Sequence, residues 1–424
     1  MDLAKHRLPF FFIILAFIIG ATFLAIKYAS GYRIDLTNKT LKPTGILVVN
    51  SSPDGAKVFA NGKLLAATNS SLSLAPGKYT LEIKKNGFLP WKKDIVIEKE
   101  LVTVADAFLF TEVPDLKPLT FSEVINPIIS PDNSRIVYSV PLPNLDAGLW
   151  VLDLTDSLFN LSKSPRQIAK SRLGSDFAKA QYSWLPDSQQ ILVEFPASNN
   201  KYLLDANGLN QLSSANEISA TLEQLETNWQ KEKELQEKAK IKRLPLIMQQ
   251  ILATQAAELQ FSPDNTKVLY EATASAQIPE NLIPPVTAAS TQKESRKIEP
   301  GKLYVYDLKE DRNFLIPFNV PKPTPTPKPL KSKITPTPTL FPPPASHISL
   351  LTPNWFPTSR HLVWIEGNKV TACEYDGTNL EVIYSGPFIF PYVFLTPSSN
   401  RLVVLTQIGT EPENKPNLFS VSLK

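Results

Sequence analysis

The sequence predicts a mainly β protein with an N-terminal transmembrane helix, a small β-sandwich and then a β-propeller that contains an inserted helical hairpin. Three observations support this prediction. An uncharged apolar run begins the chain, short alternating strands with Gly-containing turns follow it, and a strand–turn–strand pattern then recurs five times. At 424 residues the chain has room for two or three domains.

The composition narrows the class of protein. Basic residues number 44 and acidic residues 40, so a net charge of +4 gives no reason to expect nucleic acid as a partner. Proline, at 38 residues against 15 glycines, favours turns and linkers over helix. The one cysteine, Cys373, excludes an intramolecular disulfide and leaves the compartment open. We predict that Cys373 is a small core residue and not a reactive thiol.

The apolar run at the N-terminus predicts a membrane anchor. Residues 8–26 are 19 residues without a charge, and Lys5, Arg7 and Lys27 flank them. At 1.5 Å per residue a helix of this length spans about 28 Å, close to the hydrocarbon thickness of a bilayer. We therefore predict a transmembrane helix over residues 8–27 that contacts the lipid bilayer.

The alternative for this run is a cleaved signal peptide. The apolar region of a signal peptide is usually about 7–15 residues long and precedes a small-residue cleavage site. Here the run is longer, and Lys27 and Tyr28 follow it directly. The uncleaved anchor is therefore favoured, with a cytoplasmic tail over residues 1–7 and a stalk over residues 28–43. The flanking positive charges do not decide the orientation.

The segment after the stalk, residues 44–113, has the pattern of a compact β domain. Asn61-Gly62 separates two short apolar runs, a strong hairpin signal because both residue types tolerate positive φ. Tyr79, Leu81 and Ile83 alternate with polar residues, as in a half-buried strand.

These residues resemble the PEGA domain, a small β-sandwich named for a Pro-Glu-Gly-Ala motif. The motif is present as Pro53-Asp54-Gly55-Ala56, with Asp in place of Glu, and the sequences NGK, APGKYTLEIKKNGF and Trp91 follow it. PEGA domains occur on bacterial surface and envelope proteins. The resemblance implies an envelope location and no catalysis.

Residues 116–424 contain an internal repeat. Each copy has a large apolar residue, a short Pro turn and an apolar strand, and the turn prolines are Pro131, Pro186, Pro263, Pro357 and Pro397. A third strand is predicted at residues 148–154, 201–208, 302–308, 369–377 and 417–423. A fourth is predicted in the sequences RQIAK, NQLSS, NFLIPF and EVIYSG.

Four short antiparallel strands repeated in this way predict the blades of a β-propeller. The last two turn prolines are 40 residues apart, the usual blade length, whereas the other spacings of 55, 77 and 94 require insertions. The SPDN and SPDS turns resemble the repeats of TolB-type bacterial propellers, although Thr358 and Ser398 replace the Asp in the last two copies. Five copies are visible, and six blades are the alternative. We also predict that residues 116–121 pair with the strand that ends at Leu423 and so close the ring.

Two insertions interrupt the repeat. Residues 216–257 are predicted to form a helical hairpin, because Ile218, Leu222, Leu225 and Trp229 lie on one helix face and a second apolar helix begins near Pro245. The charged run over residues 231–242 is interpreted as a solvated face, with partner binding as the alternative. Residues 271–301 are predicted to be a long loop. Residues 317–345 are predicted to be a disordered Pro-rich loop, with 11 prolines in residues 317–344.

The sequence shows no catalytic, cofactor-binding or metal-binding constellation. Three histidines, His6, His347 and His361, form no ligand pair, and no Gly-rich phosphate loop is present. Asp132, Asp187 and Asp264 could act as ligands or bases, but we interpret each as a turn residue.

We therefore expect a single-pass cell-membrane protein, non-catalytic and without cofactors, with its bulk outside the cytoplasm. Its PEGA and propeller domains would bind protein or cell-wall/glycan partners. The alternative is a surface hydrolase for glycans or peptides, with two carboxylates in the propeller centre.

Overall fold

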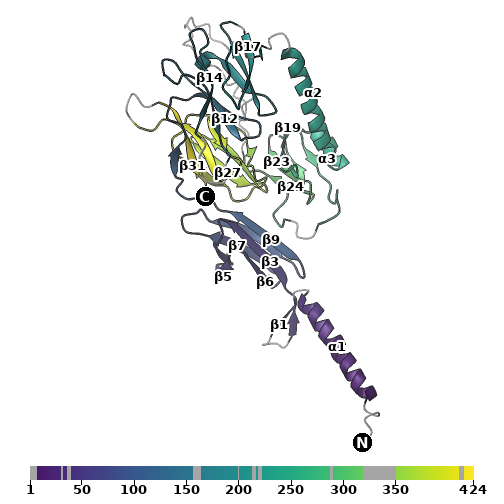
Figure 1. Cartoon of the computed structure of the whole chain (residues 1–424). Coiled ribbons are helices and arrows are strands. Elements are labelled where there is room, and N and C mark those ends of the chain that lie inside the picture. Colours follow the sequence, from purple (N-terminus) through teal and green to yellow (C-terminus); the bar gives the residue numbers. More distant parts are fainter. Residues whose placement is uncertain are drawn as a thin grey trace. The chain divides into compact units, whose positions relative to one another are not determined.

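A computed structural model describes residues 7–29, 32–35, 40–155, 164–198, 200–212, 216–217, 222–286, 290–318, 350–409 and 415–424. The chain divides into two units, labelled by element in Figure 1. The first contains residues 1–110 and 284–293, and the second contains residues 111–283 and 294–424. The Pro-rich segment 319–349 lies outside the described residues, so its predicted disorder stays a prediction.

The apolar run forms one helix, α1 (Arg7–Ala29). Its span of 19 residues from Phe10 to Tyr28 has a mean hydropathy of 2.5, and no part of it is buried in the protein. A helix that is apolar on every side and exposed is suited to lipid rather than water. The predicted stalk contains regular structure, because β1 (Arg33–Asp35) pairs antiparallel with β2 (Thr40–Lys42).

The predicted sandwich is formed by seven strands in two sheets, with the orders β6-β3-β9 and β5-β4-β7-β8. Apolar side chains from both sheets pack into one core between them. The strands are β3 (Gly45–Ser52), β4 (Lys57–Ala60), β5 (Lys63–Ala67), β6 (Ser70–Leu74), β7 (Gly77–Lys84), β8 (Trp91–Ile97) and β9 (Val102–Phe108).

Local sequence explains much of this sandwich. Asn61 and Gly62 both adopt positive φ, at 50° and 78°, as the predicted β4–β5 turn requires. Leu81 and Ile83 are fully buried on one face of β7, as their alternation predicts. No local pattern predicted that β3 pairs in parallel with β9, whose residues lie about fifty positions further along the chain.

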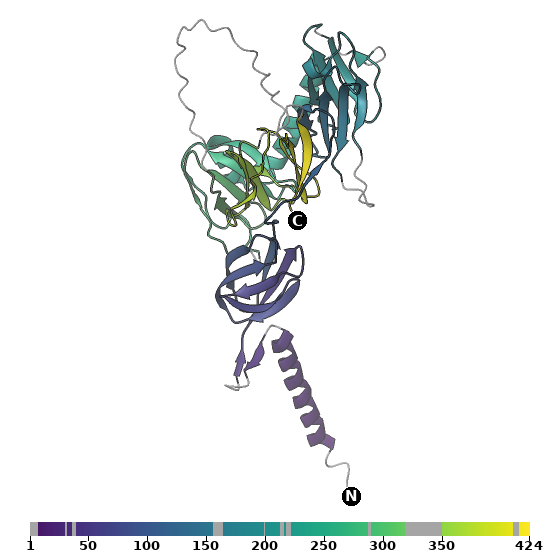
Figure 2. The same ribbon diagram turned by 90° about the vertical axis from the view of Figure 1, so that its left-hand side faces the viewer.

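The second unit contains five four-stranded antiparallel sheets, here numbered one to five in the order of their turn prolines (Figure 2). Sheet one is β11 (Ile125–Ile129), β12 (Arg135–Val140), β13 (Gly148–Asp153) and β14 (Arg166–Lys170). Sheet two is β15 (Gln181–Trp184), β16 (Gln190–Phe195), β17 (Asn200–Asp205) and β18 (Asn216–Glu217). Sheet three is β19 (Ala256–Phe261), β20 (Lys267–Ala272), β23 (Leu303–Asp307) and β24 (Arg312–Leu315). Sheet four is β25 (Asn354–Trp355), β26 (His361–Glu366), β27 (Lys369–Glu374) and β28 (Glu381–Tyr384). Sheet five is β29 (Val393–Leu395), β30 (Arg401–Thr406), β31 (Asn417–Ser422) and β10 (Leu116–Pro118).

The same turn joins the first two strands of every sheet. In each copy the residue two positions after the turn proline donates its N–H to the carbonyl of the residue before the proline, at 2.8 to 3.0 Å. That donor has positive φ in all five copies: Asn133, Ser188, Asn265, Ser359 and Ser399. The repeat in the sequence is therefore a repeat in backbone conformation, which defines the five sheets as equivalent blades of a propeller-like body.

Two sequence predictions need correction in this unit. The fourth strand of sheet two is Asn216–Glu217, not the NQLSS sequence at residues 210–214, because Asn210 instead forms hydrogen bonds to Ile168 and Asp205. The predicted loop 271–301 contains a two-stranded hairpin of β21 (Ala276–Gln277) and β22 (Lys297–Ile298).

Sheet five combines both ends of the second unit. Strand β10 pairs antiparallel with β31, with Leu116 opposite Val421 and Pro118 opposite Phe419. Two flanking hydrogen bonds extend the pairing, from Leu119 N–H to the Leu418 carbonyl at 2.8 Å and from Ser422 N–H to the Asp115 carbonyl at 2.9 Å. The predicted pairing is confirmed over residues 116–118, whereas closure of the ring stays a prediction.

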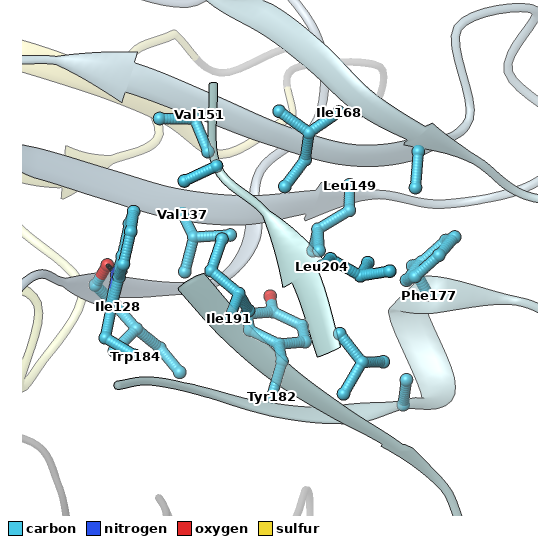
Figure 3. Packing of buried hydrophobic residues seen from close by; sticks show 14 of the residues in the cluster. Ile128, Val137, Leu149, Val151, Ile168, Phe177, Tyr182, Trp184, Ile191 and Leu204 are labelled. Carbon is cyan, nitrogen blue, oxygen red and sulfur yellow. Dashed lines mark hydrogen bonds between the residues drawn. The ribbon is translucent and has the colours of Figure 1, made fainter. Parts of the chain in front are cut away.

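Neighbouring sheets share apolar cores. Val137 and Leu149 of sheet one pack against Tyr182 and Ile191 of sheet two (Figure 3), in a cluster that the short 3-10 helix η1 (Phe177–Lys179) completes. On the other face of β12, Ile136, Tyr138 and Val140 pack against sheet five. Sheets three and four share a third cluster. Burial of both faces explains why β12, β23, β26 and β30 are almost continuously buried, whereas β16 of sheet two alternates between buried and half-buried residues.

The helical insertion lies between sheets two and three in the chain. It consists of α2 (Leu222–Ile241) and α3 (Leu246–Thr254), shorter than the predicted 216–257 because β18 and β19 take its ends. Buried Met248 and Leu252 of α3 pack on Tyr270 and Tyr304 of sheet three. The equivalent face of sheet one packs on sheet five, the sheet that precedes it around the propeller. The same face of sheet three would therefore be expected to meet sheet two, and α3 packs there in place of a neighbouring blade.

Deletion of residues 115–121 tests the pairing of β10 with β31. The deletion removes the outer strand of sheet five, and we expect a melting temperature lower by roughly 5 °C or more, as a loss of about 2–3 kcal/mol would give. Differential scanning calorimetry measures the change. Phe121→Ala is the control, because this side chain is 86% exposed and should have little effect. An unchanged melting temperature for the deletion would contradict the pairing.

Candidate functional site

The three aspartates singled out in the sequence lie in separate turns and do not form one site. The Asp132 carboxylate accepts hydrogen bonds from the Ser130 hydroxyl at 2.6 Å and the Ser134 N–H at 3.0 Å. Asp264 accepts the equivalent bonds from Ser262 and Thr266. Asp187 accepts the backbone N–H groups of the two residues that follow its turn. These contacts support the interpretation of all three as turn residues.

The turn hydrogen bonds also control the charge of these carboxyl groups. Partial burial alone would raise the pKa of Asp264, but the hydrogen bonds from Ser262 and Thr266 outweigh it and lower the pKa to about 2. At Asp132 burial is likewise outweighed by the bonds from Ser130 and Ser134, which lower its pKa. A carboxylate with a lowered pKa is a poor general base at neutral pH, so these residues are suited to structure.

Cys373 and His361 lie in sheet four and have structural positions. Cys373 is fully buried, and burial together with Asp376 and Glu374 raises the pKa of its thiol well above the usual value. The prediction of a core cysteine is confirmed. His361, also buried, lies opposite Glu374 across β26 and β27.

In two other sheets, the residues equivalent to His361 and Glu374 form an ion pair. In sheet one the equivalent residues are Arg135 and Asp153, with Nε and Oδ1 3.3 Å apart. In sheet three they are Lys267 and Asp307, 3.6 Å apart. His361 is therefore part of the repeat. His6 and His347 lie outside the described residues.

A pocket of 620 Å³ is the strongest candidate site in the second unit. Its walls come from residues in or next to the first strands of sheets one, three, four and five and from the end of α2, and no residue of sheet two is among them. The lining residues are Ile129, Asn133, Lys240, Gln260, Phe261, Ser262, Pro263, Asn265, Leu350, Thr352, Asn354, Trp355, Val393, Phe394 and Leu395.

The pocket combines a buried apolar wall with polar side chains. Leu350, Trp355 and Phe394 are at most 8% exposed. The indole N–H of Trp355 donates to the Gln260 carbonyl at 3.0 Å, which fixes this ring between sheets three and four. Asn133 and Asn265, at the positive-φ positions of two repeat turns, add half-buried amide groups. Such a lining can fix the orientation of a ligand while burying its apolar parts.

Among the described residues that line the pocket, Lys240 is the one with a charged side chain. It is half-buried near the end of α2, and its Nζ lies 5.8 Å from the centroid of the Phe261 ring. The sequence placed Lys240 in a charged run interpreted as a solvated face. That interpretation holds for the exposed residues 231–239 and is wrong for Lys240. Nothing in the sequence identified it, because the contact depends on how α2 meets sheet three.

The pocket does not supply the geometry of the alternative hydrolase. A glycosidase of the usual kind needs two carboxyl groups about 5 to 9.5 Å apart. None of the described residues that line this pocket is Asp or Glu. The described residues also contain no group of three or more His, Cys, Asp or Glu side chains suited to a metal ion. The described lining of this pocket is therefore neutral and basic.

Comparison with protein families identifies residues 44–109 as a PEGA domain. The match begins at the predicted residue, includes the strands β3 to β9 and contains the Pro53-Asp54-Gly55-Ala56 motif. The comparison with curated proteins found no match to this sequence.

The solved structures similar to this chain include β-propellers. A TolB from Agrobacterium tumefaciens shares 11% identity and a TM-score of 0.20, covering 70% of this chain and 78% of that one. TolB from Acinetobacter baumannii shares 11% identity and a TM-score of 0.21, covering 81% of this chain and 59% of that one. The β-propeller domain of the Trilobed protease from Pyrococcus furiosus shares 11% identity and a TM-score of 0.19, covering 89% and 95%. These similarities do not define a site, and the propeller-like fold rests on the five repeated sheets.

Replacing Asp264 with Asn tests the structural role of the turn carboxylate. We expect Asp264→Asn to lower the free energy of unfolding by about 1 kcal/mol at pH 7, because charge-assisted hydrogen bonds in the turn are lost. The pKa of Asp264 in the folded protein is about 2, below the value of about 4 in an unfolded chain. The stabilisation is therefore complete above about pH 4 and is lost as the pH falls toward 2.

Denaturant unfolding of wild type and variant at several pH values measures this difference. Asp146→Asn, which changes an exposed aspartate outside the repeat turns, is the control. A difference between wild type and Asp264→Asn that stays the same from pH 7 to the lowest accessible pH would contradict the proposed role.

Proposed function

We propose that this chain is a membrane-anchored, non-catalytic envelope protein whose propeller-like body binds a protein or cell-wall/glycan partner in the central pocket. The supporting observation is the pocket itself. Four blades and α2 contribute to one concave surface with apolar, amide and basic side chains, and its described lining has no acidic residue.

The chemistry of the pocket favours an extended polypeptide over a glycan. Asn133 and Asn265 each carry a donor and an acceptor, as a peptide backbone does. The buried wall around Leu350 and Phe394 suits an apolar side chain, and Lys240 suits a carboxylate. A partner segment with an acidic and an apolar residue matches this lining, and a cell-wall glycan is the alternative.

The C-terminal end of helix α1 supports the interpretation of this helix as an uncleaved membrane anchor. Helix α1 continues through Lys27 to Ala29, and the Lys27 Nζ lies 4.3 Å from the centroid of the Tyr32 ring. Lys and Tyr residues at the end of an apolar helix are typical of the membrane interface. The PEGA domain beside it supports an extracytoplasmic location for the bulk of the chain.

Fractionation followed by affinity capture tests this function on the full chain. We expect the protein in the membrane fraction after an alkaline wash, with residues 1–29 present in its intact mass. The solubilised chain should then capture its partner from an envelope extract, and Lys240→Glu should reduce capture by roughly tenfold, the effect of about 1.4 kcal/mol. Sedimentation with purified cell-wall material tests the glycan alternative in parallel.

Lys233→Glu is the matched control, because it reverses the charge of an exposed lysine on the same helix. Its capture should equal that of the wild type. Equal capture by the Lys240→Glu and Lys233→Glu variants would contradict the pocket as the binding site. A mature chain that begins after Ala29 would contradict the anchor.

A further inference from the structure

Strand β8 ends the sheet β5-β4-β7-β8 of the PEGA domain. It pairs with β7 on one side, with Ile95 opposite Tyr79. The backbone groups of alternate residues, among them Asp94 and Val96, point to the other side. An edge of this kind leaves a row of unpaired N–H and C=O groups, which other strands can pair with unless the edge is covered.

Residues from the third sheet's β20–β23 connection cover this edge. The Val96 N–H donates to the Thr291 hydroxyl oxygen at 3.3 Å. The side-chain amide of Gln292 donates to the Asp94 carbonyl at 2.6 Å. The Val96 carbonyl accepts a third bond, from the Thr103 hydroxyl at 3.2 Å. We call residues 290–293 the edge cap.

The edge cap uses side chains and does not extend the sheet. Residues 290–293 have no strand conformation, and both bonds to β8 come from the side chains of Thr291 and Gln292. A fifth strand would present its own free edge to solvent. The two side-chain bonds satisfy the Val96 N–H and the Asp94 carbonyl without creating such an edge.

One buried carboxylate holds the chain on both sides of the cap. Asp311, with a side chain 6% exposed, accepts the Leu282 N–H at 2.8 Å. It also pairs with Arg296, with Nη1 and Oδ1 3.1 Å apart, and accepts the Tyr306 hydroxyl at 2.8 Å. Leu282 precedes the cap and Arg296 follows it. The chain segments before and after the cap are therefore both bonded to Asp311, beside sheet three.

We propose that residues 290–293 cap the edge strand of the PEGA domain and that Asp311 makes this protection depend on the third sheet. The PEGA domain is then not an independent module on the chain, because its open edge is covered by residues from inside the propeller repeat. The partner that fits this edge is a segment of the same chain.

Hydrogen exchange of the full chain, read by mass spectrometry over residues 91–97, tests the cap. Thr291→Val removes the hydroxyl acceptor at constant shape, and we expect exchange at Val96 to be roughly fivefold faster. Thr291→Ser keeps the hydroxyl and should keep the wild-type rate. Gln292→Ala should also speed exchange in this segment, whereas Lys293→Ala, at an exposed residue, should not. Equal exchange in the Thr291→Val and Thr291→Ser variants would overturn the cap.

The dependence on sheet three is tested by Asp311→Asn. This substitution weakens the hold on Arg296 and leaves Thr291 and Gln292 unchanged. We expect faster exchange at Val96, with exchange over β12 in sheet one as the measure that the fold is intact. Unchanged exchange over residues 91–97 in this variant would overturn the role of Asp311.

Discussion

The pairing of β10 with β31 is the constraint on which the propeller-like body depends. A four-stranded sheet with two apolar faces cannot stand alone in water, so sheet one, whose central strand β12 is buried on both faces, needs a neighbour on each side. Sheet five packs on sheet one through Phe394, Val403 and Leu418, and its own fourth strand comes from the start of the unit. The pocket then forms because the first strands of the sheets are held around one point.

Equivalent hydrogen bonds strengthen two of the contacts between sheets. Trp184 in sheet two donates to the Ile128 carbonyl of sheet one, and Trp355 in sheet four donates to the Gln260 carbonyl of sheet three, both at 3.0 Å. Each tryptophan lies two residues before a turn proline. Where the repeat would bring sheet two against sheet three, α3 packs on Tyr270 and Tyr304 instead. At this position, where a sixth blade could lie, the described residues form the inserted helices instead.

Local features of the sequence predicted most of the fold. The Pro turns, the Asn61-Gly62 hairpin and the strand of residues 116–121 were found because each depends on a few neighbouring residues. The site was not found. Lys240 belongs to a charged run, and its place beside Phe261 depends on the packing of a helix on a distant sheet. The edge cap was not predicted for the same reason, since Thr291 and Gln292 lie in a polar loop nearly two hundred residues from β8.

The most direct test of the β10–β31 pairing is an engineered disulfide across the sheet that joins the two ends of the repeat. Pro118 and Phe419 lie opposite each other at a position between the hydrogen-bonded pairs of β10 and β31, where side chains are close. If β10 and β31 pair in this register, Pro118→Cys with Phe419→Cys oxidises to a disulfide that mass spectrometry of proteolytic fragments detects. Lys117→Cys with Phe419→Cys, shifted by one residue to opposite faces, should stay reduced. Equal oxidation of the two cysteine pairs, or no oxidation of the first pair, would contradict the pairing of β10 with β31.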